Sequence, residues 1–281
     1  MHAKDYWSKG VAFGLPALSN REVALFRAEL LGIGAQQVAA HGENWTEALG
    51  RTDMASHPLW PWMHRLATHK GLLDSVEAVL GPNLLIRNLD IFVKDPFEWD
   101  QVRWHTDWAG SDGTEDGLLT AWLSLSEGPV DEVSGSMRFG VGWHRKALPS
   151  PPKSKRVLDL GGEATGAVLA GELVQCRMDA GQLSLHHALT PHESGFNFRK
   201  KPRIGVAMRF MAPSVSQRMA GAGQGFVARG THTGNFQGVD HFPVQWTTLR
   251  AEGCNATTKR REQMQRKALW LRLKAKVRRW S

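Results

Sequence analysis

The chain changes character after Pro82, where long periodic stretches give way to short segments rich in β-branched and aromatic residues. Segments of this kind, separated by Gly, Pro, Asp or Ser, are typical of strands joined by turns. At least seven follow one another: NLLIRNLDIFVKD, QVRWHTDW, LLTAWLSLSE, SGSMRFGVGW, ELVQCRMD, GQLSLHHAL and RIGVAMRFMA. Because no helical pattern separates them, the strands are expected to pair antiparallel in a sandwich or barrel.

The residues before Pro82 follow a helical period instead. Ser19 and Glu22, three residues apart, form a capping-box pattern ahead of an apolar run, which predicts a helix over residues 20–40. A further periodic stretch has Pro61 near its start and Gly81 near its end, as helices commonly do. Helices followed by many strands predict an α+β fold that is mainly β: a jelly roll, the cupin-like double-stranded β-helix, with an N-terminal helical layer.

We expect one domain over residues 1–256. It would consist of the helical layer (1–81), the jelly-roll core (82–213) and a Gly-rich loop region (214–256). Residues 146–171, rich in Pro, Lys and Gly, are expected to form an exposed loop within the core. Residues 257–281 have a helical period with apolar positions near one face, which predicts a basic amphipathic helix.

The net charge of +8 resides in this C-terminal segment. Residues 257–281 hold ten Lys or Arg and one Glu, a net charge of +9, so the other 256 residues carry −1. A near-neutral body lacks the basic stripe of a nucleic-acid binder, so a nucleic-acid partner is not expected. The segment could instead contact an acidic partner or an anionic membrane surface, or pack its apolar face on the domain.

Cysteine content and the N-terminal sequence bear on location. Only Cys176 and Cys254 are present, so no disulfide framework can be read. The first twenty residues lack the apolar run of a signal peptide, and no run is long enough to span a membrane. Together these features favour the cytoplasm.

Two metal-binding side chains, His105 and Asp107, lie one residue apart in the segment RWHTDW. On a strand, residues i and i+2 point to the same face, so both could reach one ion. With a second His from elsewhere they would form the facial triad of non-haem Fe(II) oxygenases. The alternative is a polar alternation on an ordinary strand, because a chain with 12 His can contain such a pair by chance.

The third ligand has three candidates in GQLSLHHALTPHESGFN: His186, His187 and His192. At least one of the first two is expected to be a half-buried strand residue held by backbone hydrogen bonds. Arg203 opens the next apolar strand, where a cation is usually a solvated edge residue. In an oxygenase it could instead pair bidentately with a carboxylate of 2-oxoglutarate. Aromatic residues around the first strand, such as Trp104 and Trp108, could be core or pocket lining.

The order and spacing of several segments resemble the phytanoyl-CoA dioxygenase family of Fe(II)- and 2-oxoglutarate-dependent oxygenases, especially its bacterial members. The resemblance runs from about Leu84 to Pro213. The matching segments are IFVKDP, WHTDW, TAWLSLSE, GSMRFGVGWHR and GQLSLHHALTPHESGFN followed by RIGVAMRF. The turn at His144 departs from the family pattern, which has Pro-Gly-Ser-His there.

The resemblance assigns roles residue by residue. His105, Asp107 and His192 correspond to the three iron ligands, and Arg203 to the partner of the distal carboxylate of 2-oxoglutarate. The cosubstrate pocket would also be lined by Ser194, Trp122 and Lys94. Related halogenases have a small residue in place of the carboxylate ligand, so the presence of Asp107 favours hydroxylation.

The resemblance implies an Fe(II)-, 2-oxoglutarate- and O₂-dependent dioxygenase. It would hydroxylate an aliphatic C–H of a small organic or carrier-bound substrate and release succinate and CO₂. The alternative is a catalytically inactive jelly-roll binding protein, recruited to acidic partners, membrane or nucleic acid through residues 257–281. Loss of the ligand set would favour the alternative, and the set is complete in this sequence.

Overall fold

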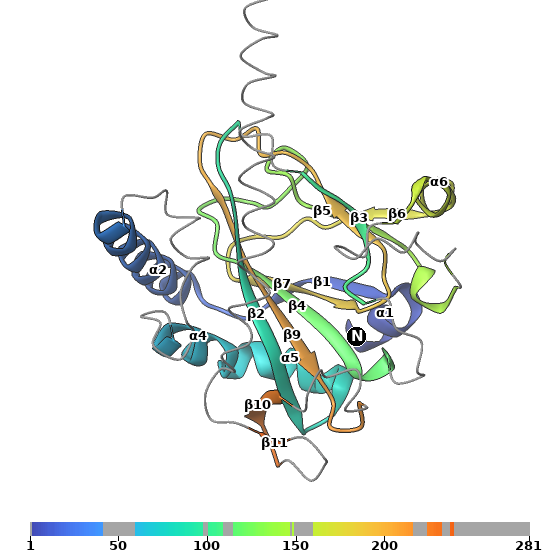
Figure 1. Ribbon diagram of the computed structural model, residues 1–281, viewed down its shortest axis with the longest axis horizontal. Coiled ribbons are helices and arrows are strands. Elements are labelled where there is room, and N and C mark those ends of the chain that lie inside the picture. Colours follow the sequence, from blue (N-terminus) through green and yellow to red (C-terminus); the bar gives the residue numbers. More distant parts are fainter. Residues whose placement is uncertain are drawn as a thin grey trace, which may run out of the picture.

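The computed structural model of the chain (Figure 1) describes residues 2–41, 60–97, 101–108, 115–146, 148, 160–215, 224–231 and 237–238. Its helices are α1 (His2–Lys9), α2 (Asn20–His41), α4 (Trp60–Ala67), α5 (Lys70–Leu80) and α6 (Gly162–Leu169), with the 3₁₀ turns η1 (Glu115–Gly117) and η2 (Trp143–Arg145). Its strands are β1 (Val11–Pro16), β2 (Leu84–Lys94), β3 (Val102–His105), β4 (Leu118–Ser124), β5 (Met137–Gly140), β6 (Leu173–Gln175), β7 (Gln182–His187), β8 (His192–Ser194), β9 (Arg203–Met211), β10 (Gln224–Arg229) and β11 (Gln237–Gly238).

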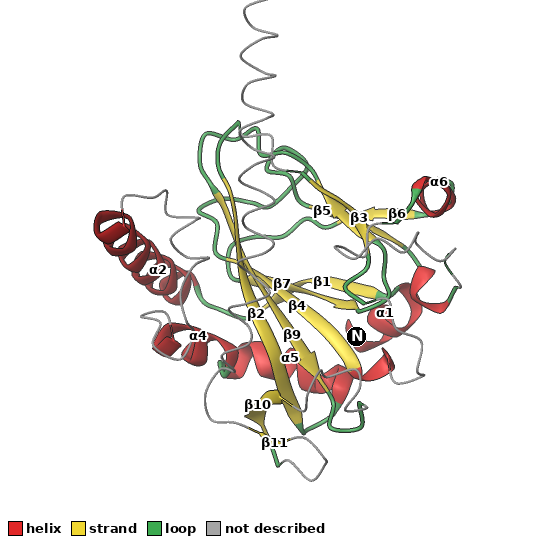
Figure 2. Ribbon diagram, viewed as in Figure 1, coloured by secondary structure: helices red, strands yellow, loops and turns green. Residues whose placement is uncertain are grey.

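The strands form two sheets. The larger has the order β1-β7-β4-β9-β2-β10-β11 and the smaller the order β3-β8-β5-β6. Apart from the parallel β10–β11 pair, neighbouring strands run antiparallel. Figure 2 shows α1, α4 and α5 along the side of the large sheet that faces away from the small sheet. The predicted mainly β, jelly-roll fold with a helical layer is confirmed.

Each central strand of the large sheet has two chemically different faces, because successive side chains point in opposite directions. On β9, one face contributes to the main hydrophobic core with the helices: Ile204, Val206, Met208 and Phe210. The opposite face of β9 carries a different set: Arg203, Gly205, Ala207 and Arg209. This second face is directed toward the small sheet, where Ala207 and Trp122 pack against Met137 and Phe139 of β5. The space between the sheets is therefore lined by the polar and small residues of the alternation.

The N-terminal part contains the expected helices and one strand that was not expected. The α2 helix begins as predicted: the Ser19 backbone N–H donates to Glu22 Oε2 at 2.7 Å, and the Glu22 N–H donates to Ser19 Oγ at 3.3 Å. The second periodic stretch forms α4 and α5, and Gly81 follows α5 with a φ of 87°. Strand β1, however, lies within the predicted helical layer and extends the large sheet beside β7.

The prediction of an exposed loop over residues 146–171 was wrong for the end of this segment, which forms α6. Ala164 and Val168, four residues apart, share one helical face and are buried. The predicted C-terminal helix over residues 257–281 and most of the Gly-rich region 214–256 lie outside the described residues. Among the described helices, none combines the length and apolarity that crossing a membrane requires.

Candidate metal centre

Two histidines of the small sheet lie side by side at the edge that faces the large sheet. His105 ends β3 and is the register partner of His192, which begins β8, and their ring centroids are 4.1 Å apart. Each ring is held in the same way: Nδ1 donates to the carbonyl two residues earlier, at 2.8 Å for His105 and 2.9 Å for His192. This tautomer leaves both Nε2 atoms as acceptors, the arrangement typical of metal-binding histidines.

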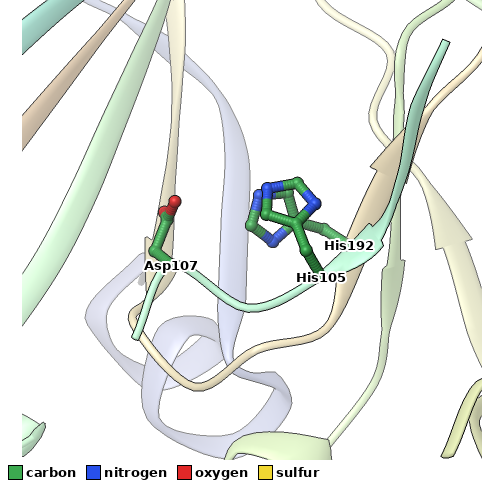
Figure 3. A group of neighbouring side chains, drawn as sticks. All are labelled: His105, Asp107 and His192. Carbon is green, nitrogen blue, oxygen red and sulfur yellow. The ribbon is translucent and has the colours of Figure 1, made fainter. Parts of the chain in front are cut away.

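The carboxylate of Asp107 completes the cluster (Figure 3). One ligand atom from each of His105, Asp107 and His192 lies within 4.8 Å of the other two. Asp107 reaches the cluster from a bend after β3, since the strand ends at His105. The prediction that His105 and Asp107 lie on one face of a strand was therefore wrong, but the structure still brings the two side chains together.

Three donors from the large sheet hold the Asp107 carboxylate. Oδ2 accepts hydrogen bonds from Thr120 Oγ1 at 2.6 Å and from His186 Nε2 at 3.0 Å. Oδ1 accepts one from Arg209 at 3.1 Å. Thr120 on β4 is the register partner of both Arg209 on β9 and His186 on β7. The three donors thus form one row across adjacent strands, beneath a carboxylate that comes from the other sheet.

The environment sets each candidate ligand in the protonation state that a metal requires. Burial lowers the pKa of His105, and it lowers that of His192 further, aided by the neighbouring imidazoles, so both rings are neutral at pH 7. Burial would raise the pKa of Asp107, but the Arg209 charge and the His186 hydrogen bond together hold it well below its usual range. Two neutral imidazoles and one ionised carboxylate fit a non-haem Fe(II) ion.

The four residues expected around the cosubstrate also lie together between the sheets. The Arg203 guanidinium is 4.6 Å from the Trp122 ring centroid and donates to the Gly135 carbonyl at 2.6 Å. Lys94 is the register partner of Arg203, and its Nζ donates to the Ser194 carbonyl at 3.2 Å. All four are at least 95% buried.

Gly205 makes room for the Trp122 ring. A Cβ at position 205 would lie 1.8 Å from Trp122 Cζ2, so no larger residue fits while the ring stays in place. The small residue on β9 therefore fixes the aromatic surface on which Arg203 stacks.

The remaining histidines divide between the cluster and the fold. His187 matches the expectation in part: it is a strand residue whose Nδ1 accepts the Leu189 N–H at 3.1 Å, but it is fully rather than half buried, and its Nε2 lies 3.1 Å from the Asp116 carboxylate. His186 instead belongs to the metal cluster through Asp107, with its ring 4.6 Å from that of His192. His144 is buried and lies 3.2 Å from the Trp7 carbonyl, so it holds the N-terminal helix rather than the metal cluster.

The family model for phytanoyl-CoA dioxygenase (PhyH) matches residues 8–205. The chain belongs to the phytanoyl-CoA dioxygenase family. This confirms the resemblance inferred from the sequence. The matched range contains the three clustered donors and Arg203, whose placement the structure shows independently.

Relatives and solved structures agree with the family. A curated relative from Stutzerimonas stutzeri, described as a probable alpha-ketoglutarate-dependent hypophosphite dioxygenase, is 27% identical over 69% of this chain and 72% of its own length. The apo structure of ThoJ, a non-heme monooxygenase, is 26% identical, with a TM-score of 0.68 over 94% of this chain and 96% of that chain. The epimerase SnoN, solved with Fe3+, alpha-ketoglutarate and nogalamycin RO, is 26% identical, with a TM-score of 0.57 over 76% of this chain and 83% of that chain.

The phytanoyl-CoA dioxygenase family and these relatives identify the protein as an Fe(II)- and 2-oxoglutarate-dependent dioxygenase that acts on small molecules. The enzyme and its cofactors, predicted from the sequence, are confirmed. The alternative of an inactive binding protein is not supported.

Sequence reasoning missed Arg209 and Thr120 as donors to Asp107, and it considered His186 only as a possible third ligand. A signal for them was present in the strand period. Arg209 follows Arg203 by six residues on one strand, so the two side chains share a face. Thr120 and Trp122 likewise share the inner face of β4. The row that joins Arg209, Thr120 and His186 depends on cross-strand register, which cannot be read from separate segments.

Proposed function

We propose that this dioxygenase hydroxylates an aliphatic C–H of a small organic or carrier-bound substrate, with His105, Asp107 and His192 as the iron ligands. The observation that carries the proposal is the cluster of these three donors, each oriented by a hydrogen bond and each in the protonation state that a metal requires. Bound iron, with 2-oxoglutarate and O₂, supplies the oxidising chemistry and yields succinate and CO₂.

The protein's own residues orient the reactants. His105 and His192 present their Nε2 atoms from the small sheet, while Asp107 is fixed against the large sheet by three donors. The three ligands thus come from β8, β3 and the bend after β3, and the hydrogen bonds to Asp107 tie this ligand set to the large sheet. The Asp107 carboxylate occupies the position that a halide would need, which supports hydroxylation over halogenation.

Arg203 would bind the distal carboxylate of 2-oxoglutarate, with Lys94, Ser194 and Trp122 around it. The buried guanidinium lies over the Trp122 ring, with Cζ 4.6 Å from the ring centroid, which restricts the movement of its planar fork. Lys94 adds a second buried cation at its register partner. Two cations on one wall favour an anion in the space that they line.

An anaerobic titration of the metal-free protein with Fe(II) and 2-oxoglutarate tests this assignment. The weak visible charge-transfer band of the chelate should appear with wild type. It should be lost with His192→Ala, and it should require more 2-oxoglutarate with Arg203→Ala. His69→Ala, which removes a histidine paired with Glu22 near the helices, is the matched control and should behave as wild type. A normal band in His192→Ala would refute the ligand assignment.

Substrate class then requires a screen by succinate release. Hypophosphite, named in the description of the Stutzerimonas relative, belongs in this screen beside small organic acids and carrier-bound acyl groups. A C–H hydroxylation is supported if the organic product gains one oxygen atom from O₂. Stimulation by hypophosphite, with no organic product, would refute it.

We further propose that the enzyme acts in the cytoplasm as one domain over residues 1–256, and that residues 257–281 contact an acidic partner or an anionic membrane surface. The net charge of +9 on this segment supports the contact. Deletion of residues 257–281 should abolish salt-sensitive binding to anionic vesicles and leave the charge-transfer band intact. Vesicle binding that is unchanged by the deletion would contradict the role of the segment.

A further inference from the structure

A small cleft lies against Asp107 on the side formed by the large sheet. Its volume is about 20 Å³, which is room for one water molecule or one small polar group. Among the described residues that line it, Arg87, Trp108 and Arg209 carry N–H donors on their side chains, and one, Asp107, carries a carboxylate. The cleft therefore offers donors beside the metal cluster.

A bulge in β2 places Arg87 in this cleft. Ile86 pairs with Phe210 and Asn88 pairs with Arg209, so two steps on β2 match one step on β9, and Arg87 is the extra residue. Bulges of this kind redirect a side chain and are frequent beside active sites. The guanidinium of Arg87 lies 4.8 Å from the Trp108 ring centroid, which fixes it at the cleft.

Arg209 has carboxylate partners, whereas the side-chain donors of Arg87 and Trp108 have none among the described residues. Arg209 is neutralised by Asp90, at 2.5 Å, and by Asp107, at 3.1 Å. Among the described residues, no carboxylate pairs with Arg87, and the buried indole N–H of Trp108 has no acceptor. Burying a guanidinium without an anion is costly. Burial, and to a smaller extent the nearby Arg209 charge, accordingly lowers the pKa of Arg87. An anionic ligand would satisfy both donors.

We propose that Arg87 and Trp108 form a subsite for a negatively charged oxygen group of the substrate, a carboxylate or a phosphorus oxyanion, held next to the iron. Arg87 is then a specificity-determining residue, and the enzyme selects small anionic substrates. This inference rests on the proposed iron site, because it places the anion beside Asp107. The cleft admits only the charged group, so the rest of the substrate must extend out of it.

Calorimetric titration of the anaerobic Fe(II)- and 2-oxoglutarate-loaded full chain tests the subsite. The probes are acetate and methylphosphonate, with acetamide as the uncharged analogue of acetate. At least one anion should bind, and acetamide should not. Arg87→Met should weaken the anion by about tenfold or more, because it removes a charge-assisted hydrogen bond. Trp108→Phe keeps the aromatic ring and removes the N–H, and it should weaken the anion by less.

Controls separate this proposal from the proposed iron and cosubstrate sites. Arg21→Met, on the exposed surface of α2, removes the same charge and should leave anion binding unchanged. The charge-transfer band measures iron and 2-oxoglutarate binding in every variant. If the band fails to form in wild type, the proposed function fails. If the band forms but neither anion binds, or Arg87→Met and Trp108→Phe bind them as wild type does, the subsite is refuted. A loss of 2-oxoglutarate affinity in Arg87→Met would assign Arg87 to the cosubstrate and also refute the subsite.

Discussion

Replacing Thr120 with Val tests whether the hydrogen bonds donated to Asp107 from the large sheet support metal binding. The two side chains have nearly the same shape, so the change removes one hydroxyl donor and adds a methyl group. Thr120 is 3% exposed, and its Oγ1 lies 2.6 Å from Asp107 Oδ2. After the change, Oδ2 keeps the hydrogen bond from His186 and Oδ1 keeps the one from Arg209.

The magnitude follows from what the hydrogen bond does with and without iron. A hydrogen bond to a charged group contributes about 1.5–3 kcal/mol, and this one forms in the metal-free protein as well. Most of its free energy therefore stabilises the fold. Only the part that fixes the orientation of the carboxylate contributes to iron affinity. Because His186 and Arg209 still hold Asp107, we expect the Kd for Fe(II) to rise by about tenfold, the lower end for such supporting residues.

Both quantities can be measured on the same protein. Urea unfolding of the metal-free chain gives the change in the free energy of unfolding, and anaerobic competition with a chromophoric chelator gives the iron affinity. Thr68→Val is the matched control, because the Thr68 hydroxyl donates to the His64 carbonyl at 2.7 Å near the end of α4. It should lower stability and leave iron affinity unchanged. If Thr120→Val also leaves iron affinity unchanged, the Thr120 hydrogen bond does not position Asp107 for the metal.

Three further predictions concern the fold and the cosubstrate wall, by which we mean the buried residues expected around 2-oxoglutarate: Lys94, Trp122, Ser194 and Arg203. Arg203→Met should weaken 2-oxoglutarate, in the charge-transfer titration, by about tenfold or more while iron affinity stays the same; equal losses of both would point to general misfolding. Gly205→Ala should cost about 1–3 kcal/mol in urea unfolding and weaken 2-oxoglutarate, since its Cβ meets the Trp122 ring, and an unaltered protein would contradict the packing. Burial, partly offset by the Asp116 hydrogen bond, lowers the pKa of His187 to about 4. Between pH 4 and about 6.5 the unfolded chain therefore binds more protons at this position than the folded protein does. The stability gained by keeping the buried ring neutral is fully present above about pH 6.5 and is lost as the pH falls toward 4. In thermal melts across this range His187→Gln should flatten the decline, and an equally steep decline would assign it to other groups.

The sequence was sufficient wherever local pattern determines structure. The alternation in RIGVAMRF specifies both faces of β9, and the Ser19–Glu22 capping box specifies the start of α2. The three clustered donors and Arg203 were identified because their spacing matches a family. Their roles as ligands and cosubstrate partner stay predictions until iron and 2-oxoglutarate binding are measured.

Features that depend on distant pairing could not be predicted in the same way. Val11 of β1 pairs with His186, far along the chain, and nothing in the first twenty residues indicates that partner. Asp107 reaches the metal cluster through a bend, which the period of a strand does not describe. Arg87 lies in the cleft because of a bulge, and a bulge becomes visible only when the register of β2 against β9 is known.

The strand period also sets the distance between the metal cluster and the cosubstrate wall. Trp122, beneath the Arg203 guanidinium, is two residues from Thr120, beneath Asp107, so the two points lie about 7 Å apart along β4. A five-carbon dicarboxylate has a length of this order, which supports the placement of 2-oxoglutarate between Arg203 and the metal cluster. A slip of one residue on β9 would turn both Arg203 and Arg209 into the core beneath the helices. The burial of Ile204, Val206, Met208 and Phe210 against the helices therefore specifies the register of the metal cluster and the cosubstrate wall at the same time.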